Sequence, residues 1–165
     1  MRVVLTAEEQ ALATTAATAR FARRRSNGSQ HRWNRTDTHT TAKETEAIGA
    51  EIAAARATGR RWQDTDTPDH NGDIGEGIQV RHTQYQTGRL LIHPDDCDDH
   101  QFILVTGAYP DYTVAGWTTG RQAKQDEFWQ ELQRGRPCFA VPQRCLTPVG
   151  GGVVVPSVEQ LTLGV

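Results

Sequence analysis

The stretch 73–83, with the sequence DIGEGIQVRHT, holds the residues best suited to chemistry. Its second half alternates apolar and polar side chains, as a strand with one buried face does. Gln79 and Arg81 therefore share one face of that strand, and Asp73, on the far side of a glycine-rich turn, lies within reach of that face. A carboxylate, an amide and a guanidinium placed together could hold a metal ion and stabilise a phosphate. The plainer interpretation is a surface hairpin with ordinary polar side chains.

A second acidic residue, Glu51, falls in a helix that the sequence predicts for residues 43–58. On a period of 3.6 residues, Glu51 lies on or beside the apolar stripe that contains Ile48 and Ile52. A carboxylate in that position costs free energy unless it is paired or bound to a metal. Glu51 is therefore a candidate for the same site as Asp73, the alternative being a glutamate at the edge of the stripe that reaches water or an arginine.

An acidic residue, a short gap and a strand with a polar, a hydrophobic and a basic residue in succession resemble the PD-(D/E)XK nuclease family, in particular its small phage-type members. The resemblance covers residues 43–146. It matches Asp73 to the first acidic residue of the family, Gln79 to the second, which is normally Asp or Glu, and Arg81 to the lysine. The first helix of the family commonly supplies a glutamate, here Glu51. The implied fold is α/β of the mixed α+β kind, with a central mixed sheet flanked by helices in a restriction-endonuclease-like core.

The function implied by this resemblance is metal-dependent hydrolysis of phosphodiester bonds in nucleic acid, as an endonuclease or an exonuclease. Glu51, Asp73, Gln79 and Arg81 would be the catalytic residues. Mg²⁺ or Mn²⁺ is the expected cofactor, held by Asp73, Glu51, the Gln79 amide oxygen and the Val80 carbonyl oxygen. Arg81 stays protonated, so it can stabilise phosphate charge but cannot replace a lysine as general base. The changes at Gln79 and Arg81 leave an alternative, a catalytically inactive protein of this fold that binds nucleic acid or a protein partner.

Charge is unevenly distributed along the chain, although the net charge is only −2. Residues 1–62 hold eleven Lys and Arg against six Asp and Glu, and residues 63–165 hold seven against fourteen. A helix predicted for residues 7–24 ends in arginines, and a polar loop with a tryptophan between two arginines follows it. Such a basic segment suits nucleic acid, DNA being the expected form, although a solvated helix end is the alternative. The predicted nucleic-acid-binding residues are Arg20, Arg23, Arg24, Arg25, Arg32, Trp33 and Arg35.

The pattern along the chain predicts an N-terminal helix and polar basic arm in residues 1–42, and a nuclease-like α/β core with a C-terminal tail in residues 43–165. No apolar run approaches the roughly 18–20 residues of a membrane span, and the first six residues lack the features of a signal peptide. We therefore expect a cytoplasmic protein with no membrane contact, and a homodimer is left open. Strands are expected at 78–84, 89–93, 101–106, 112–117, 138–141 and 153–155, a helix at 120–134, and a last turn near 157–161.

Other chemistry has weaker support in the sequence. Three cysteines, at positions 97, 138 and 145, lack the close pairing of a zinc knuckle, which favours isolated thiols. The acidic stretch 93–100 has neither the regular oxygen spacing nor the glycine turn of a calcium loop, so we expect a solvated loop there. A zinc site formed by His70, His93, His100 and a cysteine stays open as an alternative.

Overall fold

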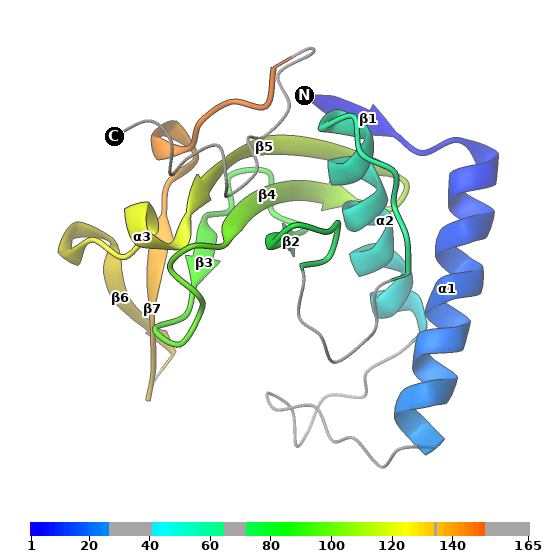
Figure 1. Ribbon diagram of the computed structural model, residues 1–165, viewed down its shortest axis with the longest axis horizontal. Helices are drawn as coiled ribbons and strands as arrows, with labels where there is room; N and C mark the ends of the chain where they lie inside the picture. The colour runs from blue at the N-terminus through cyan, green and yellow to red at the C-terminus, as the bar shows by residue number, and fades with distance from the viewer. Residues whose placement is uncertain (27–40, 65–71, 134, 151–165) are drawn as a thin grey trace.

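The computed structural model describes residues 1–26, 41–64, 72–133 and 135–150, without the side chains of residues 24–26 and 133. A four-stranded sheet and a three-stranded sheet lie beside a pair of helices (Figure 1). This arrangement confirms the predicted mixed α+β class. No helix within the described ranges is long and apolar enough to cross a membrane.

Helix α1 (Ala7–Ser26) begins with a reciprocal cap. The Thr6 N–H donates to the Glu9 carboxylate at 2.7 Å, and the Glu9 N–H donates to the Thr6 hydroxyl at 3.2 Å. Such a capping box satisfies donors that the first turn of a helix leaves free. The helix then packs on α2 (Thr41–Ala57), and small residues of both helices, including Ala17 and Ala53, are buried in one cluster. Small side chains let the two helices approach closely.

Helix α2 lies between α1 and the larger sheet (Figure 1). It ends at a left-handed glycine, Gly59, with a φ of 69°. The Arg60 N–H reaches back to the Ala55 carbonyl oxygen at 2.8 Å, the bond expected where a helix ends in a Schellman turn. This sharp stop turns residues 60–64 back along the two helices.

The larger sheet has the order β1-β5-β4-β2. Strand β4 is central and almost wholly buried, as its apolar sequence predicts. It pairs in parallel with β2 and antiparallel with β5, and β1 pairs antiparallel with β5. Beyond β2 the only partner within the described residues is the isolated bridge from Gly72 to Ile78, so most of the outer edge of β2 is left without a neighbouring strand. The strands are β1 (Arg2–Val4), β2 (Ile78–Thr83), β4 (Gln101–Ala108) and β5 (Asp111–Thr119).

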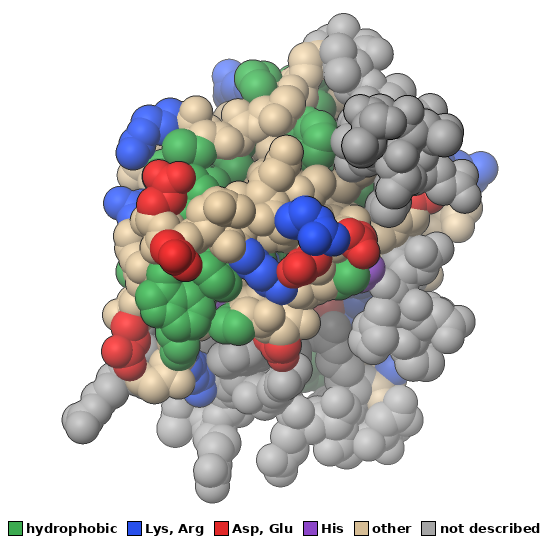
Figure 2. Space-filling model, turned by 60° about the vertical axis from the view of Figure 1, so that its left-hand side comes forward, with side chains coloured by type: hydrophobic (Ala, Val, Ile, Leu, Met, Phe, Trp, Pro, Cys, Tyr) green, Lys and Arg blue, Asp and Glu red, His purple; other side chains and the backbone are tan. Residues whose placement is uncertain are grey.

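The smaller sheet has the antiparallel order β3-β7-β6. Its strands are β3 (Leu90–Ile92), β6 (Trp129–Gln133) and β7 (Arg136–Val141). The two faces of β4 contribute to different hydrophobic clusters. Ile103 belongs to the cluster with α2, and Phe102 belongs to the cluster with the smaller sheet. On the face seen in Figure 2, acidic and basic side chains are interspersed around hydrophobic ones.

The helix predicted for residues 120–134 is wrong. A capping box formed by Thr119 and Gln122 starts helix α3 (Gly120–Ala123), but the chain leaves the helical conformation at Lys124. A single 3₁₀ turn, η1 (Asp126–Phe128), follows, and the chain then continues as β6. Trp129 packs edge-on against Phe139 of β7 with ring centroids 4.9 Å apart, so pairing across the sheet overrides the helical pattern.

The remaining predictions for the described residues agree with the structure to within about three residues at each end. The strand β1 was not predicted, because three residues carry too little pattern. A second 3₁₀ turn, η2 (Gln143–Cys145), follows β7. The strand expected at 153–155 and the turn near 157–161 lie outside the described residues.

Candidate functional site

Glu51 of α2 meets Arg20 of α1 in the interior. Two hydrogen bonds, each 3.0 Å long, join the two Nη atoms of Arg20 to the two carboxylate oxygens of Glu51. Only 7% of the Arg20 side chain and 9% of the Glu51 side chain are exposed. The geometry is the bidentate one that makes such pairs strong and specific. The carboxylate predicted on the apolar stripe is therefore paired with an arginine inside the fold.

Further polar groups complete this network. The Trp62 indole N–H donates to Oε2 of Glu51 at 2.9 Å. Nε of Arg20 donates to Oδ1 of Asp64 at 2.9 Å, and a carboxylate oxygen of Glu44 lies 3.7 Å from Nη1 of Arg20. One buried guanidinium thus contacts three carboxylates, and one of them, Asp64, also accepts a hydrogen bond from Arg23.

Asp73 lies at the outer edge of β2. Gly72 and Asp73 run beside the start of that strand, where the Asp73 N–H donates to the Ile78 carbonyl oxygen at 2.7 Å. The Asp73 carboxylate accepts the Val80 N–H at 2.7 Å. Because the N–H and C=O of one strand residue point to the same side, the Val80 carbonyl also faces this edge. A side chain at position 72 would collide with the Ile78 backbone, so glycine permits the close approach.

The two carboxyl groups interact electrostatically. Burial raises the pKa of Glu51 above its usual range; Arg20 opposes that rise, and the charge of Asp73 adds to it. Burial also raises the pKa of Asp73, against the Val80 N–H and the positive charges of Arg81 and Arg20. The charge of Asp73 therefore acts on Glu51, and the charge of Arg20 acts on both carboxyl groups.

Arg81 and Gln79 lie on the strand as expected, but Arg81 has a partner that the sequence did not suggest. Its Nη2 donates to both carboxylate oxygens of Asp96 at 3.1 Å, and its guanidinium lies 5.2 Å from the ring centre of Phe102. Gln79 is partly buried and stands opposite Phe102 in the sheet. One acidic residue of the loop 93–100 thus holds Arg81.

The predicted nucleic-acid-binding residues divide into three groups. Arg20 is buried and bound to carboxylates, so in this structure it is not a surface contact for phosphate. Arg23 is 47% exposed and donates to Asp64 at 2.9 Å. The side chains of Arg24 and Arg25 and all of Arg32, Trp33 and Arg35 lie outside the described residues.

Sequence reasoning missed the pairing of Arg20 and the contribution of residues 60–64. A signal for Arg20 exists, because it follows the buried Ala16 and Ala17 at spacings of four and three and so lies on the inner face of α1. Trp62 and Asp64 follow the end of α2 in a segment without periodicity, so the sequence carries no comparable signal for them.

The site offers oxygen donors of the kind that Mg²⁺ and Mn²⁺ prefer: the carboxylates of Asp73 and Glu51, the Val80 carbonyl and the Gln79 amide. Within the described ranges, however, no group of three or more His, Cys, Asp or Glu residues is arranged to hold a metal ion. The donor types therefore fit a magnesium-like ion only if a backbone or amide oxygen completes the set. Of the residues weighed for zinc, His70 lies outside the described ranges.

Comparisons with protein-family models, with curated proteins and with solved structures found no match for this chain.

Proposed function

We propose that the protein is a metal-dependent nuclease of the PD-(D/E)XK type, which hydrolyses phosphodiester bonds in nucleic acid, DNA in the first place. In this proposal, α2, β2 and β4 form a restriction-endonuclease-like core. One observation supports it above the others: Asp73 lies at the outer edge of β2, beside the Val80 backbone, and acts electrostatically on the buried Glu51.

Each residue has a definite task in this proposal. A bound Mg²⁺ or Mn²⁺ would polarise the phosphate and acidify a water molecule. Asp73, Glu51, the Val80 carbonyl and the Gln79 amide would hold the ion at the edge of β2. Arg81 carries a fixed positive charge that can stabilise the phosphate once it leaves Asp96, but it cannot accept a proton.

The buried carboxyl groups also make the proposed activity depend on pH. Metal binding needs both carboxylates deprotonated. Because burial raises the pKa of Glu51 and of Asp73, protons compete with the ion at a higher pH than they would at solvated acids. Metal affinity and cleavage should both increase as the pH rises through those values.

A second candidate function is a catalytically inactive protein of this fold that binds nucleic acid or a protein. A specific observation favours it: the charged groups already satisfy one another, with both Glu51 oxygens bonded to Arg20 and Arg81 bonded to Asp96. A paired carboxylate is a poorer metal ligand than a free one. The amide of Gln79 also leaves the site one negative charge short of the family pattern.

Calorimetric titration with Mg²⁺ and Mn²⁺, run beside cleavage assays on single-stranded DNA, duplex DNA and RNA, separates the two candidates. Replacing Asp73 by Asn should abolish metal binding and cleavage and leave the fold intact, because Asn keeps an oxygen for the Val80 N–H. Asp99→Asn, at an exposed acid, is the matched control. Cleavage that survives Asp73→Asn contradicts the proposed site. A folded protein with neither metal binding nor cleavage supports the inactive candidate.

Two changes at the departures from the family pattern refine the test. Gln79→Glu restores a carboxylate and should tighten metal binding roughly tenfold, which corresponds to about 1.4 kcal/mol. Arg81→Lys replaces a fixed cation by an amine that can titrate. If Gln79→Glu leaves metal affinity unchanged, residue 79 does not contact the ion.

A further inference from the structure

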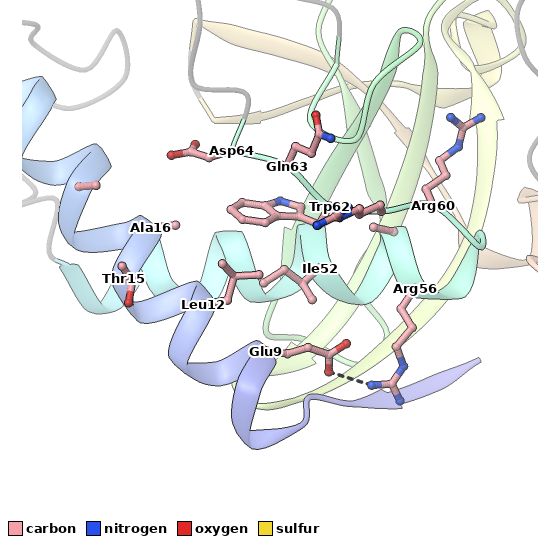
Figure 3. Close-up of a pocket in the computed structure, with 13 residues that line it drawn as sticks. Glu9, Leu12, Thr15, Ala16, Ile52, Arg56, Arg60, Trp62, Gln63 and Asp64 are labelled. Atoms are coloured by element: carbon pink, nitrogen blue, oxygen red, sulfur yellow. Dashed lines mark hydrogen bonds and ion pairs between the residues drawn. The ribbon is translucent and has the colours of Figure 1, made fainter.

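A groove of about 680 Å³ lies between α1, α2 and residues 60–64 (Figure 3). It falls within the range of about 300–1,000 Å³ that is usual for small-molecule sites. Its walls are mainly apolar, with Leu12, Ala16 and Ala19 from α1, Ile52 and Ala55 from α2, and Trp62 from the returning segment.

Trp62 is the aromatic side chain of this groove. Figure 3 shows its indole lying across the space between the helices, over Leu12 and Ile52. The side chain is only partly buried, and its N–H is held by the Glu51 carboxylate at 2.9 Å. The hydrogen bond fixes the ring in one orientation. A fixed, partly exposed indole is a suitable platform for a nucleobase.

Three arginines line the groove, together with the acidic residues Glu9 and Asp64. Arg56 is paired with Glu9 at 2.8 Å, and Arg60 is paired with the exposed Glu76 at 2.8 Å. Nε of Arg60 is buried and has no hydrogen-bond partner in the part of the chain described. Arg61 is exposed and forms no ion pair with any described residue. Arg61 and the unsatisfied Nε of Arg60 are therefore the groups in the groove that could bind an anion.

We propose that the groove binds single-stranded nucleic acid, with one unstacked base on Trp62 and the adjoining phosphate at Arg60 and Arg61. The inference rests on the proposed function, since Trp62 is bonded to Glu51 and a strand held there would lead to the candidate catalytic groups. Two helices form the walls, so a base must leave its duplex stack to enter. The substrate class is thus a single strand, such as a strand end or a flap.

The charges favour this occupant over a peptide. An apolar groove alone would suit the hydrophobic face of a partner helix. The groove described here joins an aromatic platform to a cluster of arginines, the combination that binds single strands by stacking and by backbone charge. Each arginine that contacts a phosphate also makes the affinity depend on salt.

The test measures fluorescence anisotropy of a labelled thymidine oligonucleotide of about eight nucleotides, within the range of known single-strand sites. EDTA is present, so no metal-dependent step takes part. Trp62→Leu keeps the apolar volume without the aromatic face and should weaken binding about tenfold. Trp62→Phe keeps a ring but loses the N–H to Glu51, and should restore most of the affinity. Tyr85→Leu, at an aromatic residue that is 78% exposed and outside both core clusters, is the matched control and should bind as the parent does.

Arg61→Ala supplies a second variant that does not disturb the packed interior. It should weaken binding severalfold and reduce the slope of log affinity against log salt by about 0.7. Arg121→Ala, at an exposed arginine on the smaller-sheet side, is its control. A blunt duplex of the same length should bind more weakly than the single strand.

The outcomes separate this inference from the nuclease proposal. Binding that requires Trp62 and Arg61 in a protein without cleavage activity supports the groove and contradicts the nuclease. Metal-dependent cleavage, with oligonucleotide binding unaffected by Trp62→Leu and Arg61→Ala, contradicts the proposed binding groove and supports the proposed nuclease activity. Absence of oligonucleotide binding by the folded parent, or capture of a peptide in the groove instead, also overturns it.

Discussion

Two acid-rich regions of the molecule place their carboxylates in different surroundings and shift their pKa values in opposite directions. In the loop 93–100, the Lys124 ammonium bonds the Asp98 carboxylate at 2.6 Å and the Pro94 carbonyl at 3.1 Å. Arg121 pairs with Asp99 at 2.9 Å, and these two side chains are 70% and 65% exposed. Water therefore stabilises both partners of the Arg121–Asp99 pair, whereas the Lys124 side chain is only 17% exposed and Asp98 is 47% exposed.

Between α1 and α2, by contrast, one buried guanidinium serves three carboxylates. The pKa values of the carboxyl groups in the two regions shift in opposite directions. The hydrogen bond from Lys124 lowers the pKa of Asp98, whereas burial raises the pKa of Glu51 and of Asp73. Burial, and not the density of acidic residues, is what makes ionisation costly in this region.

The largest expected difference between these regions is in stability. Glu51→Ala removes the bidentate partner of a buried arginine and should lower the free energy of unfolding by about 3 kcal/mol. Asp99→Ala, in the exposed loop, should leave the urea midpoint unchanged. Urea unfolding followed by circular dichroism measures both. A loss at Glu51 no larger than the loss at Asp99 would mean that Asp64 and Glu44 alone suffice for Arg20.

The second prediction is a gain in stability. Asp73→Asn removes a carboxylate whose ionisation burial opposes, and keeps the acceptor for the Val80 N–H. The free energy of unfolding at pH 7 should rise by about 1 kcal/mol, the size usual for stabilising substitutions at sites shaped for function. Thermal unfolding without metal measures it. A lower melting temperature would show that the charge of Asp73 supports the fold.

The fold could be predicted from the sequence wherever a local pattern was long enough. The capped, alanine-rich helix α1 and the apolar strand β4 are examples. The prediction failed for residues 120–134, where one continuous helix was expected. There the contact between Trp129 and Phe139 and the bonds of Lys124 to the loop decide the structure, and both join residues distant in the chain.

Part of the candidate site could be predicted from the sequence. Spacing pointed to Asp73, Gln79 and Arg81 on one strand, and helical periodicity pointed to Glu51. The basic cluster at the end of α1 predicted a surface role for Arg20, although its spacing from the buried Ala16 and Ala17 places it on the inner face of the helix, where it pairs with Glu51. Trp62 and Asp64 reach the site because the chain turns back after Gly59, and no pattern in the sequence predicts that position.

The third prediction concerns pH. A carboxyl group whose pKa is higher in the folded than in the unfolded protein binds more protons when folded, so stability falls as pH rises between the two values. The penalty is absent below the usual carboxyl pKa of about 4 and complete above the folded value. The stability difference between Asp73→Asn and the parent should therefore grow from pH 4 upward. Urea titrations at several pH values measure it, and a constant difference would contradict the raised pKa.

The smallest expected effect on stability is at the exposed loop. Arg121→Ala breaks the ion pair with Asp99, but water solvates both side chains and long exposed chains lose entropy when they pair. The thermal midpoint should not change measurably, and any small shift at low salt should disappear at about 1 M NaCl, where the Debye length is about 3 Å. Thermal scans at both salt concentrations check this, with Glu51→Ala as the contrasting variant whose loss of stability persists in high salt. If salt instead removes the Glu51 effect and leaves an Arg121 effect, the buried network is solvated and the contrast between the two regions fails.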